Sequence, residues 1–96
     1  KDMEDYLNDK FNTYNRVKFE IYLNENKSKD TIEIVLDVYK SDWDSLSWSE
    51  QDEYLEGLYK EINYEFPKME IKGSVYDRNE LLNSFTFSSS GKVIVK

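Results

Sequence analysis

The sequence predicts a single α+β domain in which two helices pack on one face of an antiparallel sheet. Two segments, 2–14 and 49–65, carry apolar side chains at helical spacing, and each is followed by segments in which apolar and polar residues alternate. Alternation with a period of two is typical of strands that have one buried face. With 96 residues, the chain is long enough to bury one hydrophobic core and too short for two. The expected order is therefore αββαββ across residues 1–96, with one sheet of four to five strands.

The first helix is expected within 2–14, where apolar residues recur at intervals of three or four. These residues are Met3, Leu7, Phe11 and Tyr14. At Val17 the apolar period changes to two, and it continues to residue 40 except in the polar segment ENKSKD. Two alternating runs joined by a short polar segment are typical of a β-hairpin. Residues 17–40 are therefore predicted to form an antiparallel hairpin.

The second helix is expected near 49–65, after a polar connection. Ser47 followed by Glu50 matches a capping box, in which each residue bonds the backbone of the other at the start of a helix. Ser49 is a competing N-cap. The only proline, Pro67, disfavours helical backbone at the residue before it, so the helix is expected to end there.

Two more strands and a short terminal strand are expected after this helix. The first spans about 69–76, and Gly73 within it indicates a bulge or a close approach of another segment. The turn sequence DRNE separates it from a strand at 81–88, and SSSG precedes the terminal segment KVIVK at 92–96. That last segment is predicted to be an edge strand. Flanking lysines are typical of edges protected against further pairing, although such edges also accept a partner strand.

The two helix-to-strand units at 2–40 and 49–96 are similar to each other. The stretch DYLNDKF at 5–11 aligns with EYLEGLY at 53–59, and both helices lead into strands of related pattern. One explanation is an internal αββ duplication. The other is that two amphipathic units built from the same few residue types resemble one another. Both explanations predict the same architecture.

The composition excludes several classes of site. The chain has no cysteine and no histidine, which excludes disulfides, thiolate metal sites, cysteine nucleophiles and the commonest general base. Its three glycines are not clustered, so it has no glycine-rich phosphate loop. The acidic residues fall at predicted polar positions, where their pKa values should stay ordinary. We therefore expect no enzymatic activity, no catalytic residues and no cofactor.

Four acidic residues have the spacing of an EF-hand calcium loop. Asp42, Asp44, Glu50 and Glu53 occupy its first, third, ninth and twelfth positions. The sixth position is Ser47, where the sharp turn of such a loop needs glycine. We therefore expect no metal site, and we interpret the segment as a solvated loop whose charge favours the positive end of the following helix.

The net charge indicates which partners to expect. Twenty acidic residues against thirteen basic ones give a formal charge of −7. This balance opposes binding to nucleic acid, whose phosphates attract lysine and arginine. It favours basic partners or cations. We expect a protein partner more than a small molecule, and no nucleic acid.

Partner-binding candidates follow from the strand pattern. If both helices cover one sheet face, the opposite face collects Tyr22, Val35, Tyr39 and Tyr76, together with charged side chains. Aromatic side chains on an open sheet face are typical of a contact surface. The alternative is ordinary cross-strand pairing, in which tyrosines shield the backbone and opposite charges face each other.

Trp43 and Trp48 lie in the polar connection before the second helix and are further candidates. Tryptophan is enriched at binding hot spots, although such rings also cap the edge of a core. We expect Trp48 to pack beneath the second helix and Trp43 to be the more exposed ring.

The leading functional expectation is a noncatalytic binding or interaction module. Abundant lysine, asparagine, isoleucine and tyrosine favour an AT-rich bacterial source, and we expect the soluble domain of an extracytoplasmic lipoprotein or surface protein. The chain starts at Lys1 and has no apolar run long enough to cross a membrane, so a signal peptide or lipid anchor upstream is left open. The alternative is an acidic inhibitor or immunity-type protein that neutralises a basic protein. The oligomeric state and the identity of the partner are not indicated.

Overall fold

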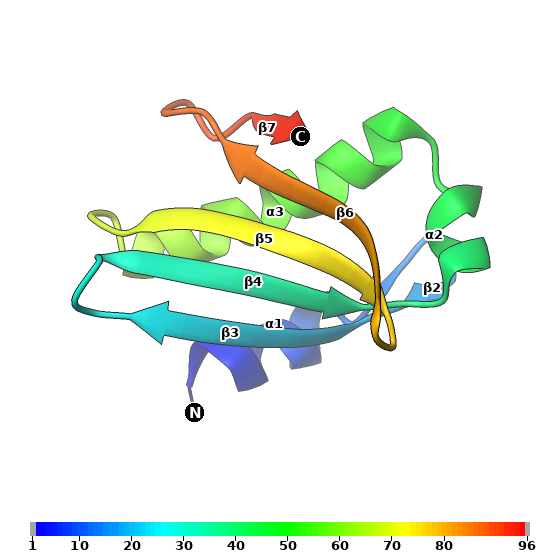
Figure 1. Ribbon diagram of the computed structural model, residues 1–96, viewed down its shortest axis with the longest axis horizontal. Helices are drawn as coiled ribbons and strands as arrows, with labels where there is room; N and C mark the ends of the chain where they lie inside the picture. The colour runs from blue at the N-terminus through cyan, green and yellow to red at the C-terminus, as the bar shows by residue number, and fades with distance from the viewer. Residues whose placement is uncertain (1, 96) are drawn as a thin grey trace.

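The computed structural model, which describes residues 2–95, has a five-stranded sheet with helices packed against it (Figure 1). In spatial order the strands are β3 (Glu20–Asn26), β4 (Thr31–Asp37), β5 (Glu70–Asp77), β6 (Glu80–Phe87) and β7 (Val93–Val95). The helices are α1 (Met3–Phe11), α2 (Lys40–Ser45) and α3 (Trp48–Glu65). The predicted α+β class and a mostly antiparallel sheet are confirmed. Among residues 2–95, no helix is both long and apolar enough to cross a membrane.

The helix α1 is shorter than predicted because a small hairpin follows it. Asp2 caps its start by accepting a hydrogen bond from the Asp5 N–H at 2.9 Å. The hairpin consists of β1 (Thr13–Tyr14) and β2 (Val17–Lys18). Its turn residues Asn15 and Arg16 have φ angles of 48° and 71°, the left-handed geometry of a tight two-residue turn. The prediction that Tyr14 belongs to the helix is therefore wrong.

The hairpin β3–β4 confirms the predicted antiparallel pairing for residues 20–37, with Tyr22 opposite Val35. The predicted bounds of 17–40 are too wide, because Val17 and Lys18 pair with β1 and Lys40 begins α2. Its outer edge is covered by α1. The Asn8 side chain accepts a hydrogen bond from the Ile21 N–H at 2.9 Å and donates one to the Ile21 carbonyl at 2.8 Å. Glu4 accepts another from the Leu23 N–H at 2.9 Å. Side chains of α1 thus take the place of a neighbouring strand along β3.

The strands β4 and β5 are parallel, which corrects the expectation of an entirely antiparallel sheet. The connection between them contains α2, where we expected only a polar loop, and then α3. With 18 residues, α3 is about 27 Å long, close to the ~23 Å of seven-residue β4. It therefore returns the chain to the end of the sheet where β4 begins. The crossover is right-handed, as expected for parallel strands (Figure 1).

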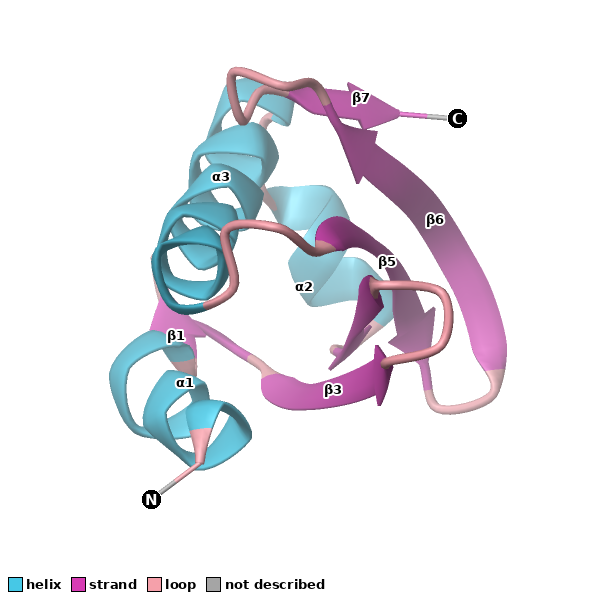
Figure 2. Ribbon diagram, turned by 90° about the vertical axis from the view of Figure 1, so that its left-hand side faces the viewer, coloured by secondary structure: helices cyan, strands magenta, loops and turns pink. Residues whose placement is uncertain are grey.

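One hydrophobic core is formed by side chains of the helices and of one face of the sheet. The helices contribute Leu7, Leu58 and Ile62, and the strands contribute mainly Ile34, Leu36, Val75 and Phe85, all at most 2% exposed. Figure 2 shows α1 and α3 together beside the sheet. They are joined by the Tyr54 hydroxyl, which donates to the Phe11 carbonyl at 2.6 Å. Burial raises the pKa of Tyr54, so it stays protonated as this donor.

The strand β5 contains both special features that Gly73 indicated, but at different residues. A Cβ at Gly73 would overlap the ring of Phe85 and lie 2.6 Å from the Ile34 carbonyl oxygen. The close approach is therefore at Gly73. The bulge lies between Val75 and Tyr76, where the pairing with β6 shifts.

Candidate functional site

The sheet face opposite the core is open to solvent and brings together three predicted site residues. Tyr22 on β3 is 45% exposed, and Val35 on β4 and Tyr76 on β5 are half-buried. Tyr22 lies directly opposite Val35, and Tyr76 lies opposite Leu81, which is 53% exposed. Val35 lies opposite Ser74 on β5, and Tyr76 is two residues after Ser74. Aromatic side chains can span this diagonal spacing between strands. The four residues form a diagonal stripe, and we name Tyr22, Val35, Tyr76 and Leu81 the open-face stripe.

Acidic side chains border the open-face stripe. The Tyr22 hydroxyl donates to Glu20 at 3.4 Å, and the negative charge of Glu20 raises the pKa of Tyr22. Asp37 lies opposite both Glu20 and Tyr76 in neighbouring strands, and its carboxylate accepts from the Arg78 N–H at 2.9 Å. A surface of aromatic rings with fixed negative charge suits a partner that brings lysine or arginine.

Tyr39 lies beside the open face and not on it. Because β4 ends at Asp37, Tyr39 is the N-cap of α2 and is 67% exposed. The prediction that it continues the strand is therefore wrong. It nevertheless borders a depression that also contains Glu20 and Asp37, so it extends the same region of the surface.

The two tryptophans have the reverse of their predicted roles. Trp43 is only 2% exposed, its indole N–H donates to the Asn83 side chain at 2.8 Å, and its ring meets Phe19 edge to face. Trp48 is 86% exposed. The reason is α2, which turns Trp43 into the core and leaves Trp48 as the first residue of α3, outside its apolar stripe. Trp43 is therefore structural, and Trp48 remains a contact candidate.

A narrow groove lies beside Trp48, between the start of α3 and β6. Its volume is about 250 Å³, and its walls include Trp43, Leu55 and Phe85. Asp52 also lines it. Burial, and to a smaller extent the charge of Glu56, raise the pKa of Asp52, which corrects the expectation that all acids would be ordinary. Sequence patterning could not identify this groove, because its walls come from three separate segments.

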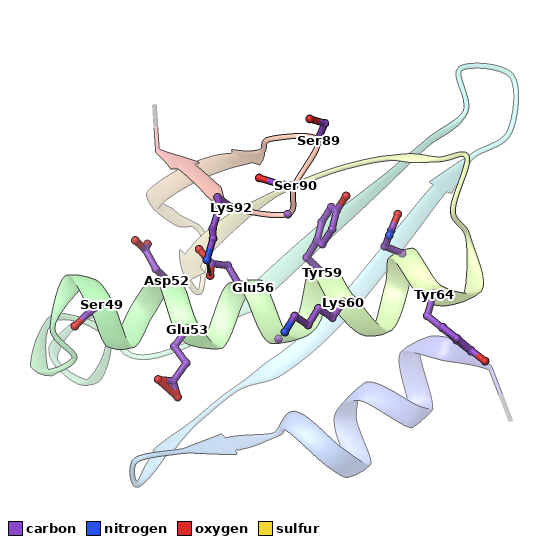
Figure 3. A pocket seen from close by; sticks show the side chains of 13 residues that line it. Ser49, Asp52, Glu53, Glu56, Tyr59, Lys60, Tyr64, Ser89, Ser90 and Lys92 are labelled. Atoms are coloured by element: carbon purple, nitrogen blue, oxygen red, sulfur yellow. Dashed lines mark ion pairs between the residues drawn. The ribbon is translucent and has the colours of Figure 1, made fainter.

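A broader hollow of about 850 Å³ lies between α3 and the β6–β7 turn (Figure 3). Glu56 on its floor accepts a hydrogen bond from the Val93 N–H at 3.2 Å and pairs with Lys92 at 3.7 Å. Gly91, at φ 85°, lies so close to Tyr59 that a Cβ there would be 2.9 Å from the ring. These contacts attach the turn to α3, and we assign the hollow a structural role. Lys96 of the predicted terminal strand lies outside the described residues.

The acidic residues with EF-hand spacing are used in other ways. Glu50 accepts from the Ser47 N–H at 2.8 Å and from Asn15 at 2.7 Å, and the Ser47 hydrogen bonds lower its pKa. Asp44 pairs with Lys40 at 2.6 Å. Within residues 2–95, no group of three or more acidic side chains is arranged to hold a metal ion.

No known family model matches the chain, and no curated protein or solved structure is significantly similar to it. Function is therefore inferred from the residues and their arrangement.

Proposed function

We propose that the chain is a noncatalytic binding module that contacts a protein partner through the open-face stripe. The observation that carries this proposal is the stripe itself: Tyr22, Val35, Tyr76 and Leu81 lie on four adjacent strands and face solvent. The proposal takes α1 and α3 as the cover of the opposite face, which leaves this face free. Tyrosine supplies large contact area at low entropic cost and is common at binding hot spots.

The noncatalytic part of the proposal is supported by the environment of the charged groups. Catalytic acids and bases usually need burial to bring their pKa near neutrality. In the part of the chain that the structure describes, no charged side chain is fully buried, and Asp52, whose pKa burial raises, is only half-buried. The carboxylates with the most hydrogen bonds, such as Glu50 and Asp77, hold backbone N–H groups at helix starts.

The second candidate is an acidic inhibitor or immunity-type protein directed at a basic protein. It is favoured by Glu20 and Asp37, which place negative charge beside the open-face stripe, and by the net charge of −7. Such charge accelerates association with a basic partner, and the effect weakens as salt rises. The extracytoplasmic bacterial setting rests on composition and is tested by the full gene sequence.

The test uses the double variant Tyr22→Ser, Leu81→Ser, whose positions are about half exposed and tolerate polar residues. Proteins captured by the wild-type chain from an extract of its source cell are purified, and their affinity is measured by titration calorimetry. The double variant should bind at least about tenfold more weakly. The control Tyr64→Ser removes a ring that is 85% exposed on α3 and should bind like wild type. Equal binding by the double variant would exclude the open-face stripe as the contact surface.

A further inference from the structure

The sheet has two edges, and α1 closes one of them. Asn8 occupies the N–H and carbonyl of Ile21 in β3, and Glu4 occupies the N–H of Leu23. A partner strand cannot bond these groups without displacing α1. Strand addition is therefore directed to the opposite edge.

The opposite edge is only partly occupied. The three residues of β7 pair with Phe85, Thr86 and Phe87 at the end of β6. Within residues 2–95, the segment of β6 from Glu80 to Ser84 has no strand on that side. Edge backbone groups of this kind are a template for an added strand.

The groove beside Trp48 borders the same segment. Asn83 and Ser84 line it from β6, and Trp48 lines it from α3. Side chains of a strand alternate between two faces, so an added strand would direct every second residue toward this groove. The intervening residues would lie beside Leu81 and Ser84 of the open face.

The charges around the groove favour a basic occupant. Its charged lining residues are Asp44 and Asp52, and no lysine or arginine lines it. Asp44 already pairs with Lys40 at 2.6 Å. Asp52 has neither a hydrogen bond nor an ion pair from its carboxylate to any residue of the described chain. Trp48, one helical turn before Asp52, presents a ring face of the kind that attracts cations.

We propose that the Glu80–Ser84 edge of β6 accepts an extended, lysine- or arginine-bearing segment of a protein partner as an added strand in line with β7. A basic side chain of that segment enters the groove, pairs with Asp52 and lies against Trp48. The inference depends on the proposed protein-binding role, but it does not depend on the open-face stripe.

The test begins with a phage-displayed library of random peptides of about ten residues, long enough for one strand, selected against the full chain. The enriched peptides should carry lysine or arginine at alternate positions. Trp48→Ala and Asp52→Asn should each lower the affinity of the chain for a resynthesised peptide about tenfold, a usual hot-spot effect. The control Tyr64→Ala, which removes an equally exposed ring at the far end of α3, should leave affinity unchanged.

Strand addition itself is tested by N-methylating the peptide at alternate residues. Methyl groups on the residues that face β6 should abolish binding, whereas methyl groups on the intervening residues should not. Hydrogen exchange should show new protection within Glu80–Ser84. Equal tolerance of both methylation patterns, enrichment of acidic or uncharged peptides, or no enrichment would overturn the inference.

The same measurements separate this inference from the proposed function. The peptides could bind the double variant Tyr22→Ser, Leu81→Ser more weakly than wild type and bind Trp48→Ala as tightly as wild type. That result would support the open-face stripe and overturn the β6 site. The reverse pattern would support the β6 site and count against the stripe. If the wild-type chain self-associates and Trp48→Ala does not, the edge would be assigned to a second copy of the chain, and the proposal of a basic partner segment would be overturned.

Discussion

Asp52 lies on α3 one turn after Trp48 and one turn before Glu56, where both the surrounding protein and a second carboxylate disfavour its charge. Burial is the larger cause of its raised pKa and repulsion by Glu56 the smaller. The folded state therefore binds the Asp52 proton more tightly than the unfolded state does. Stability falls as pH rises through these pKa values, and at neutral pH the ionised carboxylate is destabilising.

Asp52→Asn should therefore increase the free energy of unfolding at pH 7. Below about pH 3 the wild-type carboxyl is protonated in both states, so the gain should disappear there. Urea denaturation at both pH values measures it. Glu53→Gln makes the same charge change at the exposed neighbouring position. An equal gain from Glu53→Gln would attribute the effect to net charge instead of to the surroundings of Asp52.

Among the elements, α3 has the best-defined start. The Ser47 hydroxyl accepts from the Glu50 N–H at 3.2 Å, and Glu50 accepts from the Ser47 N–H at 2.8 Å. The predicted capping box is confirmed, and the competing cap at Ser49 is wrong because Ser49 lies within the first turn.

Ser47→Ala should lower the free energy of unfolding by about 1 kcal/mol, because it leaves a helix-start N–H without its acceptor. Ser49→Ala, two residues later, should change stability by less than about 0.5 kcal/mol. Thermal unfolding followed by circular dichroism compares the two variants. Similar losses in both would show that the capping box does not anchor α3.

Elements with a long periodic pattern could be predicted, and those set by tertiary contacts could not. The strands β3 and β4 and the helix α3 each carry several apolar residues at one spacing. In contrast, α2 has six residues, and β1 and β2 have two each, too few to show a period. The parallel pairing of β4 with β5 depends on where α3 delivers the chain, which no local pattern encodes.

The residues of the candidate site likewise divide into those that a local pattern predicts and those that depend on tertiary contacts. Tyr22, Val35 and Tyr76 are predictable because alternation along each strand assigns them to one face. The exposure of Trp48 and the burial of Trp43 depend on α2, so sequence spacing assigned them incorrectly. Leu81 joins the stripe through the bulge after Val75, which changes the register of β6.

For the whole molecule, the internal duplication of 2–40 and 49–96 stays a prediction. The strand directions restrict how the two units could be related by a rotation. Because β4 and β5 are parallel, each strand of the β5–β6 hairpin runs antiparallel to the strand it would match in the first unit: β5 to β3, and β6 to β4 (Figure 1). If α1 and α3 cover the same face, as the proposed function takes them to do, a rotation that superposes one hairpin on the other places its helix on the wrong face. A duplication would therefore require one unit to have rearranged.

The covered edge of β3 gives a prediction for the molecule as a whole. Asn8→Ala removes both hydrogen bonds to Ile21 and should lower the free energy of unfolding by about 1–2 kcal/mol. It should also increase light scattering at high protein concentration, because an uncovered edge pairs with other chains. Asn24→Ala removes an exposed side chain of the same type from β3 and should change neither property. Unchanged scattering for Asn8→Ala would show that α1 does not protect this edge.

The same arrangement sets a limit on polymer growth. A chain that accepted a neighbour beyond β6 would still end, on its far side, at α1, whose side chains occupy the Ile21 N–H and carbonyl and the Leu23 N–H of β3. A third chain would find these groups already bonded, so α1 opposes the stacking of further chains into a continuous cross-β ribbon while it stays docked.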